Sequence, residues 1–177
     1  MKMGTRSVLY GVHQIFWHPL TVAAAWRRLY GAWPKWWEWV AICLHDVGYV
    51  GKSEMDSADG ITHPELGARL TKKIVGLCSS KSRAEEAFRL SLYHSSHYAR
   101  VAGQPVSRLY LPDKASILVE PEWLYLLRAR LSGEIREYVA RESEKVGFEL
   151  TVRAWLSLYK EKIRAKVAEE GVKRLSV

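Results

Sequence analysis

The sequence has few cysteines and no long apolar run. Cys43 and Cys78 are the two cysteines among 177 residues, and neither belongs to a metal or redox motif, so both are expected to be buried free thiols. No stretch reaches the roughly 18 uninterrupted apolar residues that a membrane span needs. After the basic N-terminus, Tyr10, His13 and Gln14 interrupt any signal-peptide segment. We therefore expect a cytoplasmic protein without a membrane partner.

Strand-like alternation, internal repeats and low-complexity segments are lacking as well. Apolar residues instead recur at helical spacing, and proline or glycine marks the ends of the segments. Hydrophobic residues make up 48% of the chain and charged residues 26%, which is typical of a globular domain. The sequence predicts an all-α, single-domain helical bundle over residues 1–177.

Helix start and stop signals divide the chain into segments. After an opening helix or extended arm, helices are predicted over residues 18–30, 36–45, 63–75, 82–97, 113–120, 123–130, 132–144 and 148–170. The fourth of these is expected to have Ser82 as its N-cap, with Glu85 three residues later as in a capping box, and to carry His94 and His97 near its end. A polar loop is predicted between Gly48 and His63.

The charge balance is strongly basic. The net charge of +8 suggests an anionic ligand, and it favours a phosphate-bearing small molecule over nucleic acid. The basic stretch from Lys160 to Lys173 is interpreted as a solvated helical face, because no basic and aromatic platform for nucleic acid accompanies it.

An adjacent His-Asp pair ends the apolar run over residues 41–48. A buried ionisable pair is costly unless it is hydrogen-bonded, paired or bound to a cation, so His45 and Asp46 require a partner. Further candidates lie next to other predicted helix ends, where they can converge: His18, His63, His94, His97 and Asp113. Imidazole and carboxylate together suit divalent Zn, Mn, Fe, Co or Ni. His13 is interpreted as a capping or packing residue.

Five segments carry these residues: His18-Pro19-Leu20-Thr21-Val22-Ala23, Leu44-His45-Asp46-Val47-Gly48, His63-Pro64-Glu65-Leu66-Gly67-Ala68, Tyr93-His94-Ser95-Ser96-His97 and Asp113-Lys114. Together they resemble the HD-domain superfamily of metal-dependent phosphohydrolases. The resemblance implies a helical catalytic core over about residues 14–130, followed by C-terminal helices over 131–177. Its motifs are specific to the superfamily and not to a substrate.

The resemblance also implies the metal ligands. One site would be formed by His18, His45, Asp46 and Asp113. HD proteins with further histidines hold a second metal nearby, which here implies His63 and His94 as ligands, with Asp46 bridging both ions. His97 is either a further ligand or a phosphate contact. The expected cofactors are one or two divalent ions of Mn, Fe, Co, Ni, Zn or Mg.

The sequence departs from the family pattern after the His-Asp pair. Many members place lysine directly after His-Asp-x-Gly, but here Tyr49 stands in that position and Lys52 follows three residues later. Related 5′-deoxynucleotidases carry an acidic residue soon after the pair for acid-base work. The nearest acids here are Glu54 and Asp56, each of which is either catalytic or an ordinary polar loop residue.

Substrate contacts are expected from basic and aromatic side chains. Arg27, Lys52 and Lys114 are candidate phosphate contacts, although each can equally be an ordinary surface charge. Trp17, beside His18, is a candidate for stacking on a nucleobase. Otherwise Trp17, Trp33, Trp36, Trp37 and Trp39 are expected to pack in the core.

Three functions remain open from the sequence. The first is a phosphohydrolase that acts on a small phosphorylated metabolite, preferably a nucleotide or deoxynucleoside triphosphate. The second is a phosphodiesterase for cyclic nucleotides, dinucleotides or single-stranded nucleic acid, which the second-metal histidines favour and the lack of a Gly-Tyr-Pro signature disfavours in its HD-GYP form. The third is a non-catalytic nucleotide-binding module. Homo-oligomer formation is left open.

Overall fold

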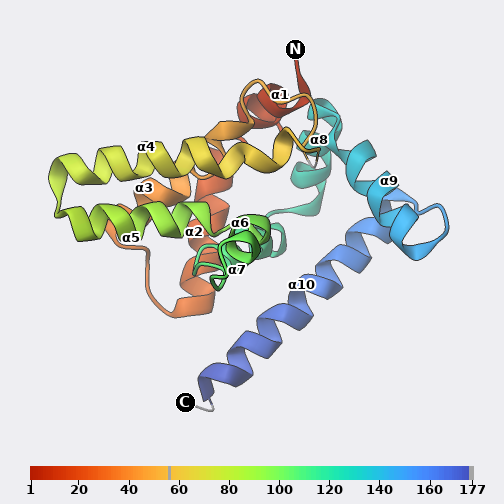
Figure 1. Cartoon of the computed structure of the whole chain (residues 1–177). Coiled ribbons are helices and arrows are strands. Elements are labelled where there is room, and N and C mark those ends of the chain that lie inside the picture. The colour runs from red at the N-terminus through yellow and green to blue at the C-terminus, as the bar shows by residue number, and fades with distance from the viewer. Residues whose placement is uncertain (56, 176–177) are drawn as a thin grey trace.

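Helices form the regular secondary structure of the part of the chain that the computed structural model describes, residues 1–55 and 57–175 (Figure 1). The α-helices in this part are α1 (Met3–Tyr10), α2 (Trp17–Tyr30), α3 (Trp36–Leu44), α4 (His63–Cys78), α5 (Lys81–Leu92), α6 (Ser96–Val101), α7 (Tyr110–Ala115), α8 (Glu122–Ser132), α9 (Glu134–Val146) and α10 (Val152–Leu175). Short 3-10 turns are η1 (Val47–Tyr49), η2 (Gly60–Thr62) and η3 (Ser116–Leu118). These residues contain no strand, so the all-α prediction is confirmed.

The local start and stop signals place most helices correctly. Gly31 ends α2 in the left-handed conformation, with φ 73°, which glycine adopts without steric cost. Pro64 lies in the first turn of α4, where its missing N–H removes no helical hydrogen bond. His45 follows α3 as its C-cap, so the His-Asp pair stands at the end of that helix.

The predicted cap of the fourth helix is wrong by two residues. Ser80, and not Ser82, caps α5, because the Ser80 Oγ accepts a hydrogen bond from the Arg83 N–H at 3.2 Å. The predicted C-terminal end is also wrong: α5 ends at Leu92, and His94 lies in the turn between α5 and α6 instead of on the helix.

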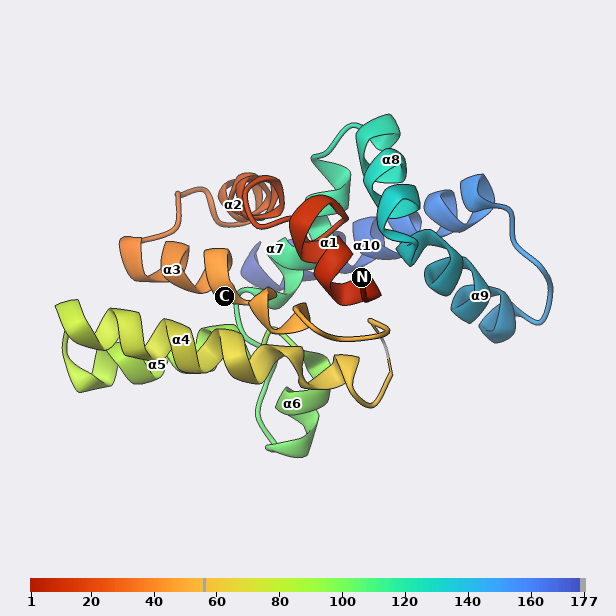
Figure 2. The ribbon, with the colours of Figure 1, turned by 90° about the horizontal axis from the view of Figure 1, so that it is seen from above.

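Helices α4 and α5 form a long antiparallel hairpin that packs against α3 (Figure 1). A second group of helices, α8 to α10, lies toward the other end of the molecule, with α1 and α7 between the two groups (Figure 2). Each group has its own apolar core, built around Trp26 and Ile42 on one side and around Tyr125 and Trp155 on the other. The ends of α3, α4 and α7 meet between these cores.

Two glycines allow the backbone around the His-Asp pair to pack closely. A Cβ on Gly48 would lie 2.0 Å from the His63 carbonyl oxygen, and a Cβ on Gly67 would lie 2.3 Å from that of Leu44. Any side chain at these positions would push the start of α4 away from the end of α3. The two glycines therefore set the distance between His63 and the His-Asp pair.

Replacing Gly67 with alanine should lower the free energy of unfolding by about 1–3 kcal/mol, because overpacking against a backbone carbonyl outweighs the better helix propensity of alanine. The matched control is Gly76→Ala in the same helix. Its Cβ would meet the Ala84 Cβ at an ordinary 3.7 Å. That variant should gain about 0.5–1 kcal/mol. Urea unfolding of both variants measures the difference, and equal stabilities would contradict the close packing.

Several expectations about burial are wrong. Cys43 and Cys78 are free but exposed. Their apolar neighbours in the sequence lie on other faces of the same helices. Trp17, Trp33 and Trp36 are also 40–53% exposed, since little packs over the ends of α2 and α3. Lys160 is buried rather than solvated, and its Nζ lies 2.8 Å from the Glu122 carboxylate. None of the described helices is long and apolar enough to cross a membrane.

Candidate metal centre

Six histidine and aspartate side chains meet at the junction of the helix ends. They come from the start of α2 (His18), the end of α3 (His45 and Asp46), the start of α4 (His63), the turn after α5 (His94) and α7 (Asp113). All six are buried, with exposed fractions from 0% to 9%. The structure thus brings together the six residues of the two implied metal sites, but not His97, the further candidate ligand.

The first group consists of His18, His45, Asp46 and Asp113. The His18 Nε2 lies 3.3 Å from Asp46 Oδ2 and 3.2 Å from Asp113 Oδ1, and the corresponding distances of the His45 Nε2 are 3.0 and 3.5 Å. Neighbouring ligands on an ion with bonds of about 2.1 Å are separated by roughly 3.0–3.4 Å. The four donors are therefore spaced as ligands of one ion.

The second group consists of Asp46, His63 and His94. The other oxygen of Asp46, Oδ1, lies 3.5 Å from the His63 Nε2 and 3.6 Å from the His94 Nε2. The two imidazole nitrogens lie 3.2 Å apart. Each oxygen of Asp46 therefore faces its own set of donors.

Backbone carbonyls orient three of the imidazole rings. The Nδ1 of His45 contacts the carbonyl of Ile42 at 2.8 Å, the Nδ1 of His63 contacts that of Gly60 at 2.9 Å, and the Nδ1 of His94 contacts that of Ser91. A carbonyl only accepts, so in each ring Nδ1 carries the hydrogen and donates it. Nε2 is then the ring nitrogen that faces the centre, as is usual for a metal-binding histidine.

This arrangement leaves donor atoms without partners. The His63 and His94 Nε2 atoms face each other with two lone pairs, which is unfavourable unless a cation or proton lies between them. The His45 Nε2 and Asp46 Oδ2 are buried and lack a hydrogen-bond partner among the described residues. Buried polar atoms without partners are costly, so the donor set fits divalent ions.

The metal-free cluster is strongly coupled electrostatically. Burial alone would raise the pKa of the Asp46 carboxyl, but the His45 and His13 rings outweigh it and hold that pKa well below its ordinary value. Burial would lower the pKa of His45, but the Asp46 carboxylate outweighs this effect and raises that pKa to about 10. Burial lowers the pKa of His63 well below its ordinary value, against the effect of Asp46. The ring of His63 is therefore neutral, as metal binding requires.

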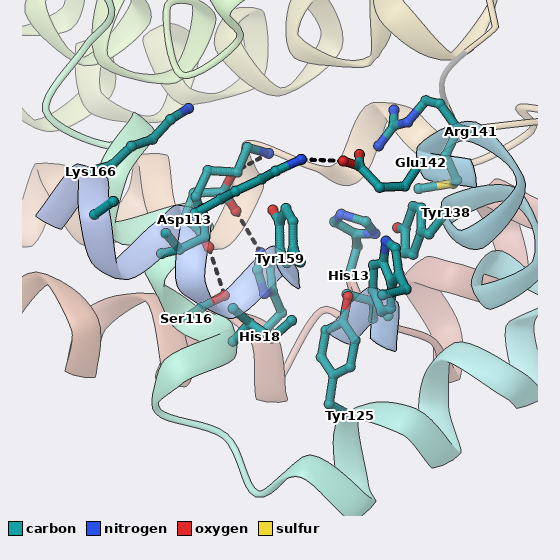
Figure 3. Close-up of a pocket in the computed structure, with 18 of the residues that line it drawn as sticks. His13, His18, Asp113, Ser116, Tyr125, Tyr138, Arg141, Glu142, Tyr159 and Lys166 are labelled. Atoms are coloured by element: carbon teal, nitrogen blue, oxygen red, sulfur yellow. Dashed lines mark hydrogen bonds and ion pairs between the residues drawn. The ribbon is translucent and has the colours of Figure 1, made fainter. Parts of the chain in front are cut away.

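A cavity of about 510 Å³ opens beside the first group (Figure 3). His18 and Asp113 line its floor, and α9 and α10 supply much of its wall through Tyr138, Arg141 and Tyr159. The resemblance leaves these two helices outside the catalytic core, but here they enclose the space over the metal centre. The volume is within the range of small-molecule sites, about 300–1,000 Å³.

The candidate residues for substrate contact are dispersed. Lys114 lines the cavity, where the Asp113 carboxylate, 3.1 Å away, raises the pKa of its ammonium group. The cavity lining does not include Trp17, which donates to Glu120 at 3.1 Å, or Arg27, which lies over the ring of Trp33. Lys52 bonds to Asp59 and Thr62 instead.

His97 and Glu54 also belong to neither metal group. His97 packs edge-on against Tyr98. Glu54 is exposed on the loop before η2, although its neighbour Met55 lines the cavity. Asp56 lies outside the described residues. The catalytic roles of Glu54 and Asp56 stay predictions.

Sequence reasoning missed His13 as a residue of the site. The structure places it on the cavity, with its Nε2 3.9 Å from Asp46 Oδ2 and its Nδ1 3.0 Å from the Glu134 carboxylate. The one available signal is that His13 precedes His18 by five residues. Glu134 lies 121 residues from His13, and no local pattern connects the two.

A buried cluster of imidazole and carboxylate donors at helix ends is consistent with an HD-like metal site. Comparisons of the chain with protein-family models, with curated proteins and with solved structures find no match. The donors and the cavity therefore carry the functional proposal.

Proposed function

We propose that the protein is an HD-type, metal-dependent phosphohydrolase that acts on a small phosphorylated metabolite, preferably a nucleotide. The observation that carries the proposal is the position of Asp46, whose two oxygens face separate groups of buried donors. Divalent ions held by these residues would supply activation of water and neutralisation of the phosphoryl oxygens of a substrate. The chain's own side chains would hold the ions, shield the site from bulk water and orient the phosphate.

The charge and shape of the cavity support an anionic substrate. Lysines and arginine outnumber acids among its lining residues: Lys114, Arg141, Lys145, Lys162 and Lys166 against Asp113, Glu142 and Glu169. Asp113 pairs with Lys114, and Glu142 pairs with Lys145 and Lys162, so basic groups remain in excess after pairing. Aromatic rings of Tyr125, Tyr138, Trp155 and Tyr159 line the same space and offer surfaces for a base or sugar.

The second donor group favours one other hydrolytic function. Asp46, His63 and His94 offer three ligands for a second ion, which leaves positions for substrate oxygens. A paired-metal centre of this kind also suits phosphodiester hydrolysis. A phosphodiesterase for cyclic nucleotides, dinucleotides or single-stranded nucleic acid is therefore the second candidate.

A substrate panel tests these functions. Protein loaded with Mn²⁺ is incubated with nucleoside monophosphates, deoxynucleoside triphosphates, cyclic nucleotides, dinucleotides and a single-stranded oligonucleotide, and the products are followed by phosphorus NMR. We expect metal-dependent hydrolysis of monoesters or triphosphates. Preferential cleavage of diesters would favour the phosphodiesterase. Saturable binding of metal and nucleotide without any turnover would instead identify a binding module.

The control is the double variant His45→Ala, Asp46→Ala, which removes a ligand from each side of the centre. It should fold, as judged by circular dichroism, but should neither retain metal nor hydrolyse any member of the panel. Full hydrolysis by this variant in its metal-free form would refute the phosphohydrolase proposal.

A further inference from the structure

Tyr49, the residue at which the sequence departs from the HD pattern, packs directly on a metal-ligand candidate. The centroids of the Tyr49 and His63 rings lie 3.8 Å apart and the ring planes differ by 12°, so the two rings are stacked face to face. Tyr49 is buried, with 7% of its surface exposed. Its ring therefore forms part of the packing around the second donor group.

The backbone after the His-Asp pair places the Tyr49 ring in this position. The 3-10 turn η1 begins directly after Asp46, and the Tyr49 N–H donates to the Asp46 carbonyl oxygen at 3.0 Å. Gly48 allows this turn to lie against the backbone of His63, because only a residue without a Cβ fits there. The next side chain along the chain, that of Tyr49, consequently reaches the His63 ring.

Neighbours from other elements hold the Tyr49 ring in turn. Tyr49 belongs to an apolar cluster with Val8 of α1 and Met55 of the loop before η2. The His13 ring lies against it at an angle of 46°, with 5.0 Å between the centroids. Tyr49 also lines the cavity, whereas His63 does not. It is thus a part of the cavity wall that packs against the second donor group.

Two contacts together fix the orientation of the His63 ring. The hydrogen bond from Nδ1 to the Gly60 carbonyl at 2.9 Å sets the direction of the ring within its plane. The stacked Tyr49 ring sets the plane itself, because a tilted imidazole would collide with it. In this orientation the His63 Nε2 lies 3.5 Å from Asp46 Oδ1 and 3.2 Å from the His94 Nε2.

An aromatic face suits an imidazole that serves as a metal ligand. A ring that shares its lone pair with a cation carries part of the positive charge, and the face of an aromatic ring attracts positive charge. An aliphatic side chain of similar volume would offer neither this attraction nor a flat surface. The stacking contact therefore supports His63 most strongly when an ion is bound.

We propose that Tyr49 is the positioning residue of the second donor group, and that its stacked ring holds His63 as a ligand for an ion bound by Asp46, His63 and His94. This inference rests on the metal centre of the proposed function, and it does not depend on the identity of the substrate. It gives a role to the residue that replaces the lysine of many HD proteins.

Calorimetric titration with Mn²⁺ alone tests the inference. The unmodified protein should bind two ions per chain. Tyr49→Leu keeps much of the apolar volume but has no ring, and it should weaken binding of the second ion roughly 10- to 100-fold, as is typical when a contact that orients a ligand is lost. The first ion should keep its affinity, because all four donors of the first group remain. Tyr49→Phe retains the ring and should bind both ions like the unmodified protein.

Two controls separate positioning of His63 from general packing. Val8→Ala removes apolar contact from the cluster that contains Tyr49, and Val8 does not line the cavity. This variant should lose stability in urea unfolding but keep both Mn²⁺ affinities. In a His63→Gln background, which lacks the ring that Tyr49 holds, Tyr49→Leu should change the remaining Mn²⁺ affinity less than about twofold. Should Tyr49→Leu fail to fold, Tyr49→Met serves for the same comparisons.

Three results would overturn the inference: unchanged affinity for the second ion in Tyr49→Leu, equal weakening of both ions in that variant, or a single Mn²⁺ in the unmodified protein. Failure of the proposed function has a different signature. In that case the unmodified protein binds two Mn²⁺ ions but hydrolyses no ester, and the effect of Tyr49→Leu on the second ion remains.

Discussion

Replacing Asp46 with asparagine should remove metal from both donor groups and lower the rate of hydrolysis on the order of 10³-fold or more. An amide has the shape of the carboxylate but no charge, and it can present its oxygen to one group only. The NH₂ would face the other group, where it would repel an ion. Among the described residues, Asp46 is the one that belongs to both groups, so no other single substitution there is expected to affect both.

The metal content of Asp46→Asn can be measured by elemental analysis after dialysis, and its binding by thermal unfolding with and without Mn²⁺. Metal at 100 times its dissociation constant stabilises a folded protein by about 2.7 kcal/mol, so Tm of the unmodified protein should rise by about 5–10 °C. The variant should show no rise. The control Glu86→Gln removes an exposed carboxylate that pairs with Arg83, and it should behave like the unmodified protein. Normal metal content in Asp46→Asn would contradict a bridging role.

The double variant His63→Gln, His94→Gln should reduce the metal stoichiometry from two ions per chain to one. The first group would keep His18, His45, Asp46 and Asp113, which suffice for one ion. The rate of hydrolysis should fall by roughly 10²- to 10³-fold, because one of the two charges that neutralise the phosphoryl oxygens is lost. Glutamine retains most of the volume and polarity of histidine, so the fold should persist.

Electron paramagnetic resonance of the Mn²⁺-loaded protein separates the two states. Two nearby Mn²⁺ ions are magnetically coupled, whereas a single bound ion gives an isolated six-line spectrum. The unmodified protein should show the coupled signal, and the double variant the isolated one. The control His18→Gln acts on the first group and should weaken that site instead. A single Mn²⁺ in the unmodified protein would reduce the centre to a mononuclear one and weaken the case for the phosphodiesterase.

The metal-ligand candidates could be named from the sequence because the segments that carry them resemble the HD-domain superfamily. Several of these residues also adjoin a local signal. His18 and His63 precede a proline at a helix start, and His45 and Asp46 end an apolar helix. Such signals depend on neighbouring residues, so one sequence is enough to find them. The error at Ser82 has the same origin: two serines two residues apart both satisfy the local rule for a cap, and only the Ser80 hydroxyl reaches a helical N–H.

Burial was harder to predict from the local pattern. The apolar run around Cys43 suggested a fully buried segment, but α3 has an outer face on which Cys43 is exposed. Conversely, Lys160 appeared to be a solvated charge, and the approach of Glu122 from α8 accounts for its burial. In both cases, burial of the side chain depends on whether a residue from another part of the chain packs against it.

The sequence by itself determined the helical class and most helix starts, because these depend on side-chain chemistry and short-range spacing. The six metal-ligand candidates followed from its resemblance to the HD-domain superfamily. Tertiary structure alone decided that α9 and α10 wall the cavity and that Glu134 holds His13. These features are contacts between segments up to 121 residues apart. The physical reason is that helix packing, and not local periodicity, determines which distant side chains meet.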